Sequence, residues 1–418
     1  TLTDEVTSSM ACSNAYCNNA QVVILPADKA ADYDTVDSLS GLRFAVESGS
    51  AGMAQAEEKG LMYTDVVDQA TALLEVKSGT ADAAIIEASK IFSKNLMAKY
   101  HIPTAKYQTF TELAPALAYI EAEGAPIVVK ADGLALGKGV IVAQTVAEAQ
   151  EAARSMMDGR KFGQAGARVV IEECMVGPEV TVLAFCDGEH LVPMLSSQDH
   201  KRAYDGNQGP NTGGMGAFCP SPNYTPAIAA ECMEKIFLPT IRAMNAEGCP
   251  FKGCLYFGLM LTPDGPKVIE YNCRFGDPET QVVLPLLESD LLHIMQSCTD
   301  GTLAQQEVKF SDGAAACVIL ASGGYPVAYE KGKPISGLVD GQLPDEENVT
   351  VYHSGTAITE DGQLVTNGGR VLGVTATGPR LTNALSHAYE AAEKISFEKL
   401  HKRSDIGLRA LKALAEKQ

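Results

Sequence analysis

Residues 253–275, GCLYFGLMLTPDGPKVIEYNCRF, constrain the fold most strongly, because two long apolar runs meet at a TPDG turn. This pattern predicts an antiparallel hairpin of two long strands. Side chains alternate along a strand, so Glu270, Asn272 and Arg274 should share one face of the second strand. The first strand is apolar on both faces, and a polar face beside it is costly to bury without a partner.

The polar face of this hairpin has the chemistry of a metal–phosphate site. A carboxylate with an amide oxygen suits Mg²⁺, which prefers oxygen ligands and takes others from phosphates. Arg274 would neutralise phosphate charge, and Asp277 and Glu279 extend the acidic cluster. The alternative is a solvated strand face with no ligand.

The chain has 418 residues, too many for one compact core, so about two to four domains are expected. Strands alternate with helices up to about residue 310, and short strands between glycine turns follow. We therefore expect an α/β and α+β multidomain fold: a small α/β lobe at 1–86, a core at 87–310 with a mobile part at about 109–180, and a β-rich domain at 311–418. Helices are expected at 88–100, 111–123, 146–157, 226–247 and 381–395.

Charge and cysteine content exclude several classes of protein. The net charge of −19 argues against a general nucleic-acid binder, which needs a basic face. Eleven cysteines without a CxxC pair indicate reduced thiols, and with them a cytoplasmic protein. No apolar run approaches the ~18 residues of a membrane span.

Two further segments could contact a nucleotide. GLALGKG (133–139) lies between two expected strands and lacks the Walker A spacing, but a glycine-rich hairpin tip can fold over phosphates. Lys130 precedes it and Lys138 lies at its tip; a simple hairpin turn is the alternative. EECMVGPE (172–179) ends a strand, and Glu179 could accept from ribose hydroxyls, although such a segment read alone is more often a surface turn.

A third segment, DHKRAYDGNQGPNTGGMGAF (199–218), combines two cations with five glycines. Lys201 and Arg202 supply charge, and Gly213 and Gly214 free the backbone to wrap an anion. The alternative is a disordered surface loop.

Together these motifs resemble one enzyme family. VVKADGLALGKGV, the QDHKRAYDGNQGPNTGGMGAFCPSP segment, RFGDPETQ, HSGT and NGGRVLGV are similar to glycinamide ribonucleotide synthetases (phosphoribosylamine–glycine ligases), which are ATP-grasp enzymes of purine synthesis. The similarity runs from about Glu87 to the C-terminus. It implies that ATP phosphorylates the glycine carboxylate, and that the amine of 5-phosphoribosylamine then attacks the acyl phosphate to give an amide, ADP and phosphate.

The resemblance also implies residue roles. ATP contacts are expected at Lys130, Gly137, Lys138, Gly139, Glu172, Cys174 and Glu179. Glycine and phosphoribosylamine contacts are expected at Lys201, Arg202, Asn211, Thr212, Gly213, Gly214 and Asp277. Glu270 and Asn272 would hold Mg²⁺ or Mn²⁺. Arg274, Asp277 and Lys201 would act in catalysis, and the protein is expected to be a monomer that binds no nucleic acid or membrane.

Residues 1–86 depart from that family, as do Asn207 in place of an acid and HSGT in place of HAGT. TVDSLSGLRFAVESGSAG and LLEVKSGTADAAII resemble one lobe of a periplasmic-type amino-acid-binding protein, whose SGSAG turn would hold a carboxylate. We therefore expect a chimera with a junction near 86/87. Two alternatives remain: a binding module with an inert ATP-grasp part, or an ATP-grasp ligase with another acceptor.

Overall fold

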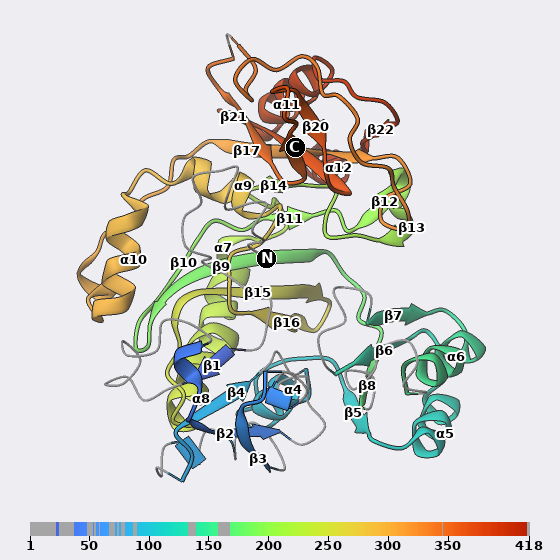
Figure 1. Ribbon diagram of the computed structural model, residues 1–418, viewed down its shortest axis with the longest axis vertical. Helices are drawn as coiled ribbons and strands as arrows, with labels where there is room; N and C mark the ends of the chain where they lie inside the picture. The colour runs from blue at the N-terminus through green and yellow to red at the C-terminus, as the bar shows by residue number, and fades with distance from the viewer. Residues whose placement is uncertain are drawn as a thin grey trace. The chain divides into compact units, whose positions relative to one another are not determined.

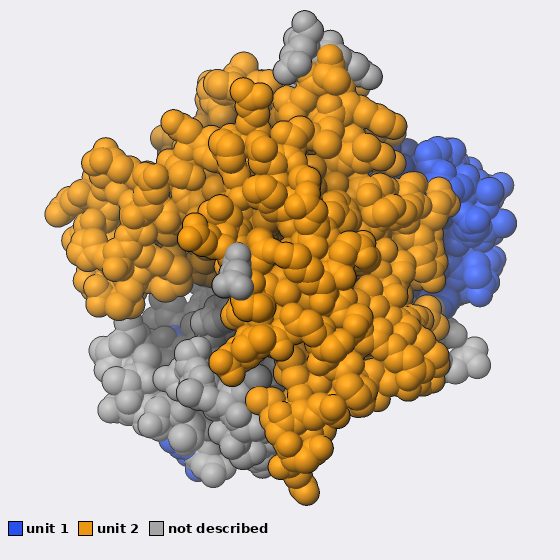
Figure 2. Space-filling view, turned by 90° about the horizontal axis from the view of Figure 1, so that it is seen from above, with its two compact units in different colours: residues 1–98, 105–174 blue, residues 99–104, 175–418 orange. Residues whose placement is uncertain are grey.

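The computed structural model describes residues 22–24, 37–47, 53, 56–57, 59–66, 72, 75–76, 80–86, 90–132, 139–157, 168–344 and 346–415. These residues belong to two compact units, one formed by 1–98 with 105–174 and the other by 99–104 with 175–418 (Figure 2). The glycine turn at 48–52 and the loop tip at 133–138 lie outside the described residues. The architecture is the expected mixture of α/β and β-rich parts, whereas the boundaries at 86/87 and 310/311 stay predictions.

The first unit contains a small, mostly parallel sheet, as expected for its N-terminal part. Its strands, in sheet order, are β1 (Val22–Ile24), β4 (Ala83–Ile86), β2 (Arg43–Glu47) and β3 (Met62–Val66). β2 runs parallel to β3 and β4, and β1 is antiparallel to β4. Phe44 and Val46 point to one face and pack with Ala56, while Ala45 between them points to the other face and packs with Ala72 and Ala81, so both sides of β2 are buried.

A second, antiparallel sheet in the same unit is covered by two helices (Figure 1). Its strands, in sheet order, are β5 (Tyr107–Phe110), β8 (Val169–Glu173), β6 (Ile127–Ala131) and β7 (Val140–Ala143). The helices are α5 (Leu113–Glu123) and α6 (Val146–Met157), and α4 (Lys90–Lys99) precedes them. In α6 the buried positions Ala149, Ala152, Ala153 and Met156 recur at helical spacing, so its apolar side faces the sheet.

The second unit is built on the predicted hairpin. The sheet order is β10 (Leu191–Pro193), β9 (Glu179–Asp187), β15 (Lys252–Thr262) and β16 (Gly265–Asn272), all antiparallel. One face packs against a continuous helical segment, where the Phe237 and Phe257 rings lie 4.3 Å apart. That segment consists of α7 (Pro226–Cys232), a π-helical turn (Met233–Phe237) and α8 (Leu238–Ala246).

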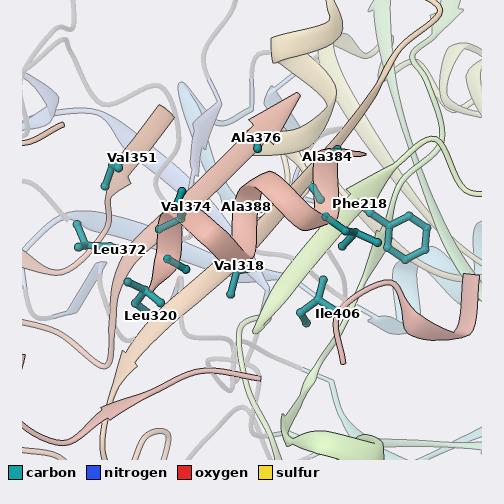
Figure 3. Close-up of a cluster of buried hydrophobic side chains, with 14 of the residues drawn as sticks. Phe218, Val318, Leu320, Val351, Leu372, Val374, Ala376, Ala384, Ala388 and Ile406 are labelled. Carbon is teal, nitrogen blue, oxygen red and sulfur yellow. The ribbon is translucent and has the colours of Figure 1, made fainter. Parts of the chain in front are cut away.

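The C-terminal part forms the expected β-rich layer, but its sheet also recruits two strands from residues 198–219. The order is β11 (Gln198–Asp199), β14 (Gly216–Cys219), β17 (Ala314–Ser322), β21 (Arg370–Gly378) and β18 (Val349–His353), with β22 (Leu400–His401) on β17. Every residue of β17 is buried, because α11 (Leu381–Ala392) contributes to a core on one face and a second core covers the other. Figure 3 shows the first core, to which Val318 of β17, Val374 of β21 and Ala388 of α11 contribute.

The remaining elements are short. They are β12 (Arg202–Tyr204), β13 (Gln208–Asn211), β19 (Thr356–Ile358), β20 (Leu364–Thr366), α9 (Thr280–Val283), α10 (Leu291–Asp300), α12 (Leu408–Ala415) and the 3₁₀ turns Asp37–Leu39, Asp205–Asn207, Leu284–Leu286 and Leu303–Gln305. Among the described helices, none combines the length and the apolar character that crossing a membrane requires.

Candidate active site

One face of the β9–β15–β16 sheet gathers the polar side chains that the sequence singled out. Gly258 of β15 lies opposite Thr181 of β9 and opposite Glu270 of β16, so these positions share a face. By alternation, Glu179 and Asn272 lie on that face too. Gly258 leaves space for the carboxylate, since a Cβ there would lie 3.2 Å from Glu270 Cγ.

Lys201 lies over this acidic face. Its Nζ is 3.5 Å from Glu179 Oε2 and 4.0 Å from Glu270 Oε1. The negative charge of Glu179 raises the pKa of Lys201 well above its usual value, and Glu270 acts in the same direction. The ammonium group therefore stays protonated beside two carboxylates, although burial opposes it.

A buried hydrogen-bond network lies next to this group. Glu279 is 3% exposed and accepts a hydrogen bond from the Tyr256 hydroxyl at 2.9 Å, while the Thr181 and Tyr256 hydroxyls are 3.0 Å apart. Burial and the charge of Glu279 raise the pKa of Tyr256, so its hydroxyl remains a donor. The same two causes raise the pKa of Asp199.

The glycine-rich segment differs from the expectation that its backbone wraps an anion. The Gly213 N–H donates to the Tyr325 hydroxyl at 3.1 Å, and the Gly214 N–H donates to Thr212 Oγ1 at 3.0 Å. The Thr212 N–H donates to the Lys201 carbonyl at 2.7 Å. These three donors are thus satisfied within the protein, because hydroxyl and carbonyl acceptors lie beside them.

Gly214 is required by close packing. Its φ is +116°, and a Cβ would lie 2.5 Å from Pro278 Cδ and 2.6 Å from Asp199 Oδ1. The loop thereby approaches the 277–279 segment at van der Waals distance, so the segment is an ordered part of the second unit.

The C-terminal strands supply a cation that the sequence reasoning did not assign. Arg370, the first residue of β21, donates from Nη1 to the carbonyls of Gly213 and Asp277, both at 3.0 Å. Its Nη2 contacts Asp277 Oδ2 at 2.8 Å. The only signal in the sequence was the position of Arg370 within the family-like stretch NGGRVLGV.

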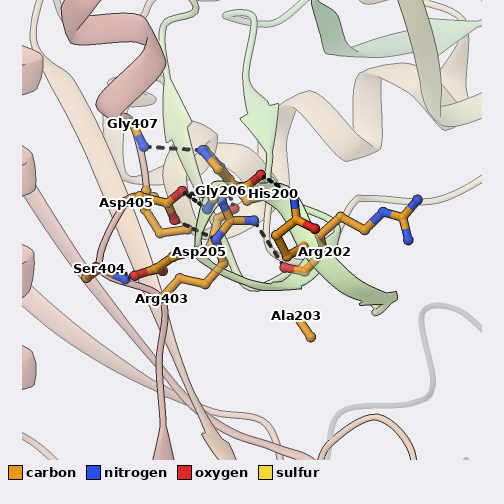
Figure 4. A network of polar contacts seen from close by, with 12 residues as sticks. His200, Arg202, Ala203, Asp205, Gly206, Arg403, Ser404, Asp405 and Gly407 are labelled. Carbon is orange, nitrogen blue, oxygen red and sulfur yellow. Dashed lines mark hydrogen bonds and ion pairs between the residues drawn. The ribbon is translucent and has the colours of Figure 1, made fainter.

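A second contact network joins residues 200–206 to the C-terminal segment (Figure 4). Arg403 is 1% exposed and binds Asp405 with two hydrogen bonds, Nε–Oδ1 at 2.7 Å and Nη2–Oδ2 at 2.8 Å. Its Nη1 donates to the Arg202 carbonyl at 3.1 Å, and Asp405 Oδ2 accepts from the Gly206 N–H at 2.9 Å. Burial opposes ionisation of Asp405, but the hydrogen bonds from Arg403 and the Gly206 N–H, together with the Arg403 charge, outweigh it and lower the pKa of Asp405 to about 2.

His200 lies in this network as a neutral ring. Its Nε2 accepts a hydrogen bond from the Gly407 N–H at 3.3 Å, and its Nδ1 lies 3.3 Å from the Gly216 carbonyl. These partners place the proton on Nδ1. Burial, and then the positive charge of Arg403, lower the pKa of His200 to about 4.

In the first unit, Lys130 belongs to a buried ion group. Its Nζ is 2.6 Å from Glu172 Oε1, and Lys94 Nζ is 2.9 Å from Glu172 Oε2. All three side chains are at most 8% exposed. Burial lowers the pKa of Lys94 and raises the pKa of Cys174. The role of Lys94 was not predicted, because its position in a helix carries no distinguishing pattern.

The other predicted site residues that the structure describes contact backbone groups rather than the acidic face under Lys201. Arg202 donates to the Gly209 carbonyl at 2.7 Å, and Arg274 donates to the Phe275 carbonyl at 2.8 Å. Asn211 pairs with Arg202 between β13 and β12. The Gly139 carbonyl accepts from the Ala131 N–H, while the predicted Gly137 and Lys138 lie outside the described residues.

The donor set of Glu270 and Asn272 fits Mg²⁺ or Mn²⁺ in its usual phosphate-bound form. Among the residues that the structure describes, no three histidine, cysteine or acidic side chains form a metal-binding group. Mg²⁺ commonly takes one or two protein carboxylates and completes its shell with phosphate and water oxygens. One carboxylate and one amide on the same strand face agree with that pattern.

Comparison with known proteins identifies the family of this chain. The family model described as phosphoribosylglycinamide synthetase, ATP-grasp (A) domain, matches residues 88–280, and the model of the C domain matches 315–409. A phosphoribosylamine–glycine ligase of Vibrio vulnificus is 48% identical over 385 residues, covering 89% of each chain. The chain belongs to the phosphoribosylamine–glycine ligase family.

Solved structures agree with this ligase fold. A phosphoribosylamine–glycine ligase from Thermotoga maritima matches with a TM-score of 0.70 and 31% identity, covering 87% of this ligase and 99% of that chain. A biotin carboxylase domain from Hydrogenobacter thermophilus, solved with MgADP, matches with a TM-score of 0.57 at 13% identity, which shows a shared fold only.

The comparisons give no support to a binding-protein lobe or a chimera. The Yersinia pestis phosphoribosylamine–glycine ligase is 44% identical over 395 residues and covers 94% of this ligase. An alignment of that extent cannot leave out residues 1–86. The resemblance to a periplasmic-type lobe was carried by short runs of the N-terminal sequence, and the SGSAG turn among them lies outside the described residues.

Proposed function

We propose that this chain joins glycine to 5-phosphoribosylamine at the expense of ATP, with release of ADP and phosphate. The observation that carries the proposal is Lys201 lying over Glu179 and Glu270 on the β9–β15–β16 face. Relatives that are 44–48% identical over most of the chain are named phosphoribosylamine–glycine ligases, which supports the choice of substrates.

Glu270 and Asn272 would hold Mg²⁺ or Mn²⁺, which neutralises phosphate charge when bound. Lys201 keeps its proton because Glu179 raises its pKa, so it can stabilise negative charge that develops on a transferred phosphoryl group. Arg274, on the neighbouring turn, would bind phosphate oxygens. In the first unit, Lys130 would contact a phosphate of ATP, and its Nζ is held 2.6 Å from Glu172 Oε1.

The acceptor would be bound by the 199–214 segment and Asp277. The Asp277 side chain is 46% exposed and is held by Arg370, so one carboxylate oxygen has a fixed direction. A fixed carboxylate can orient an amine for attack on an acyl phosphate. The proposal includes a monomeric protein in the cytoplasm, where ATP is available.

The test measures ADP release with ATP and Mg²⁺, with and without glycine and phosphoribosylamine. We expect ADP release to require both substrates. Glu270→Gln should lower turnover by at least about 100-fold, since it removes the anionic metal ligand. Glu234→Gln, on the exposed side of the helical segment, is the matched control and should keep turnover.

Three results would argue against the proposal. Unchanged turnover in Glu270→Gln would remove Glu270 from the metal site. ADP release that needs glycine but not phosphoribosylamine would indicate another acceptor. Binding of an amino acid without any ATP-dependent turnover would favour a binding module with an inert ATP-grasp part.

A further inference from the structure

The backbone N–H and the backbone carbonyl of Gly213 are both held by residues of the C-terminal part. Its N–H donates to the Tyr325 hydroxyl at 3.1 Å, and its carbonyl accepts from Arg370 Nη1 at 3.0 Å. A Cβ at this position would lie 3.0 Å from Arg370 Cζ, so the guanidinium lies directly against the glycine backbone. Both hydrogen-bonding groups of this glycine are therefore fixed.

Arg370 also fixes the second predicted acceptor segment. The same Nη1 donates to the Asp277 carbonyl at 3.0 Å, and Nη2 contacts the Asp277 carboxylate at 2.8 Å. A guanidinium is planar and rigid, so contacts from its two terminal nitrogens set the position of Gly213 relative to Asp277. The Arg370 side chain is 19% exposed, which limits competition from water.

Tyr325 is itself held in place by packing. A Cβ at Gly369 would lie 2.2 Å from Tyr325 Cδ2, so the ring rests on the backbone that leads into Arg370. Tyr329 packs against Tyr325 with ring centroids 6.1 Å apart. The second glycine of NGGR thus has a physical role, because it admits the ring whose hydroxyl reaches Gly213.

We propose that Arg370 and Tyr325 are positioning residues for phosphoribosylamine, because they fix the Gly213 loop against Asp277. This inference rests on the proposed function and deepens it. Both side chains act through Gly213 and Asp277, so their loss should weaken acceptor binding and leave ATP and glycine binding intact. The C-terminal sheet thereby determines acceptor affinity.

The experiment compares KM values for phosphoribosylamine, glycine and ATP in Tyr325→Phe, Arg370→Met and Arg370→Lys. Tyr325→Phe removes one hydrogen bond, so its KM for phosphoribosylamine should rise about fivefold. Arg370→Met removes three contacts and should raise it by about 50-fold or more, with Arg370→Lys between the two. The KM values for ATP and glycine should change less than about twofold.

Tyr329→Phe and Arg242→Met are the matched controls, since they remove a hydroxyl from the same aromatic pair and a guanidinium from an exposed helix position. Both control variants should keep the wild-type KM values for phosphoribosylamine, glycine and ATP. Thermal midpoints in the presence of ATP show whether the variants are folded. Tyr325→Phe keeps the test valid if Arg370→Met does not fold.

The inference is overturned if Tyr325→Phe and Arg370→Lys retain the KM for phosphoribosylamine, or if all three KM values rise together. A change in the glycine KM alone would also contradict it. These results overturn the inference alone when the wild-type protein still releases ADP in the presence of both glycine and phosphoribosylamine. Absence of that release in the wild type would instead overturn the proposed function together with this inference.

Discussion

Lowering the pH from 7 to 5 should destabilise the second unit through His200. The buried ring accepts a hydrogen bond from the Gly407 N–H on Nε2, so a proton on Nε2 removes that acceptor and places a charge beside Arg403. The folded pKa is about 4, whereas the usual value is 6.5. Between pH 6.5 and pH 4, His200 is protonated in the unfolded chain and neutral in the folded chain. The free energy of unfolding therefore falls as the pH drops toward 4.

The size of the effect follows from these two pKa values. Between pH 7 and pH 5 the linkage relation gives a loss of about 2 kcal/mol from this one group. The charged groups around the ring act in both directions: Arg403 and Arg409 lower the pKa, and Asp405 raises it. Burial is the largest cause, so the direction does not depend on the balance of these charges.

The assay is urea unfolding at pH 7 and pH 5, followed by hydrogen exchange of peptides that contain Gly216 and Gly407. His200→Gln is the comparison variant, since its amide can donate to the Gly216 carbonyl and accept from the Gly407 N–H without titrating. The free energy of unfolding of the wild type, relative to that of His200→Gln, should fall by about 2 kcal/mol from pH 7 to pH 5. His190→Gln, at a half-exposed position, is the control. An equal pH dependence in the wild type and His200→Gln would refute the reasoning.

Three other substitutions test separate parts of the structure. Arg403→Met leaves the Asp405 carboxylate without its bidentate partner, and urea unfolding should show a loss of about 3–5 kcal/mol; an unchanged midpoint would mean that the pair adds no net stability. Gly214→Ala brings a Cβ within 2.5 Å of Pro278 Cδ at a φ of +116°, so turnover should fall more than about tenfold while ATP affinity measured by calorimetry holds. Equal turnover would show that the loop can move away. Glu172→Gln removes the carboxylate from two buried ammonium groups and should destabilise the first unit by about 3 kcal/mol or more, visible as a lower thermal midpoint; a stable variant would contradict the ion group.

Local patterns predicted most of the elements. The two apolar runs at 253–275 became β15 and β16, and alternation placed Glu270 and Asn272 on one face because a strand repeats every two residues. The C-terminal strands and the helix at 381–392 were likewise readable from apolar runs between glycines. These strands and helices depend on residues that are close in the sequence, so the sequence alone was sufficient to predict them.

The features that could not be predicted depend on contacts between residues that are far apart in the sequence. Arg370 contacts a glycine 157 positions away, and Arg403 contacts a carbonyl 201 positions away. β11 and β14 have only two and four residues, so they show no measurable periodicity. The glycines at 213 and 214 looked like an anion cradle because composition cannot reveal that Tyr325 and Thr212 already occupy their N–H groups.

The shared sheet also limits how the protein can be divided. β14 pairs with β17 from Gly216–Val318 to Cys219–Ala315, so a polypeptide ending before residue 311 would present an open strand edge. Such an edge invites pairing with another copy and hence aggregation. Truncation is therefore a poor way to isolate the nucleotide-binding part, and protease cleavage within residues 306–313, before β17, should leave two fragments that co-purify.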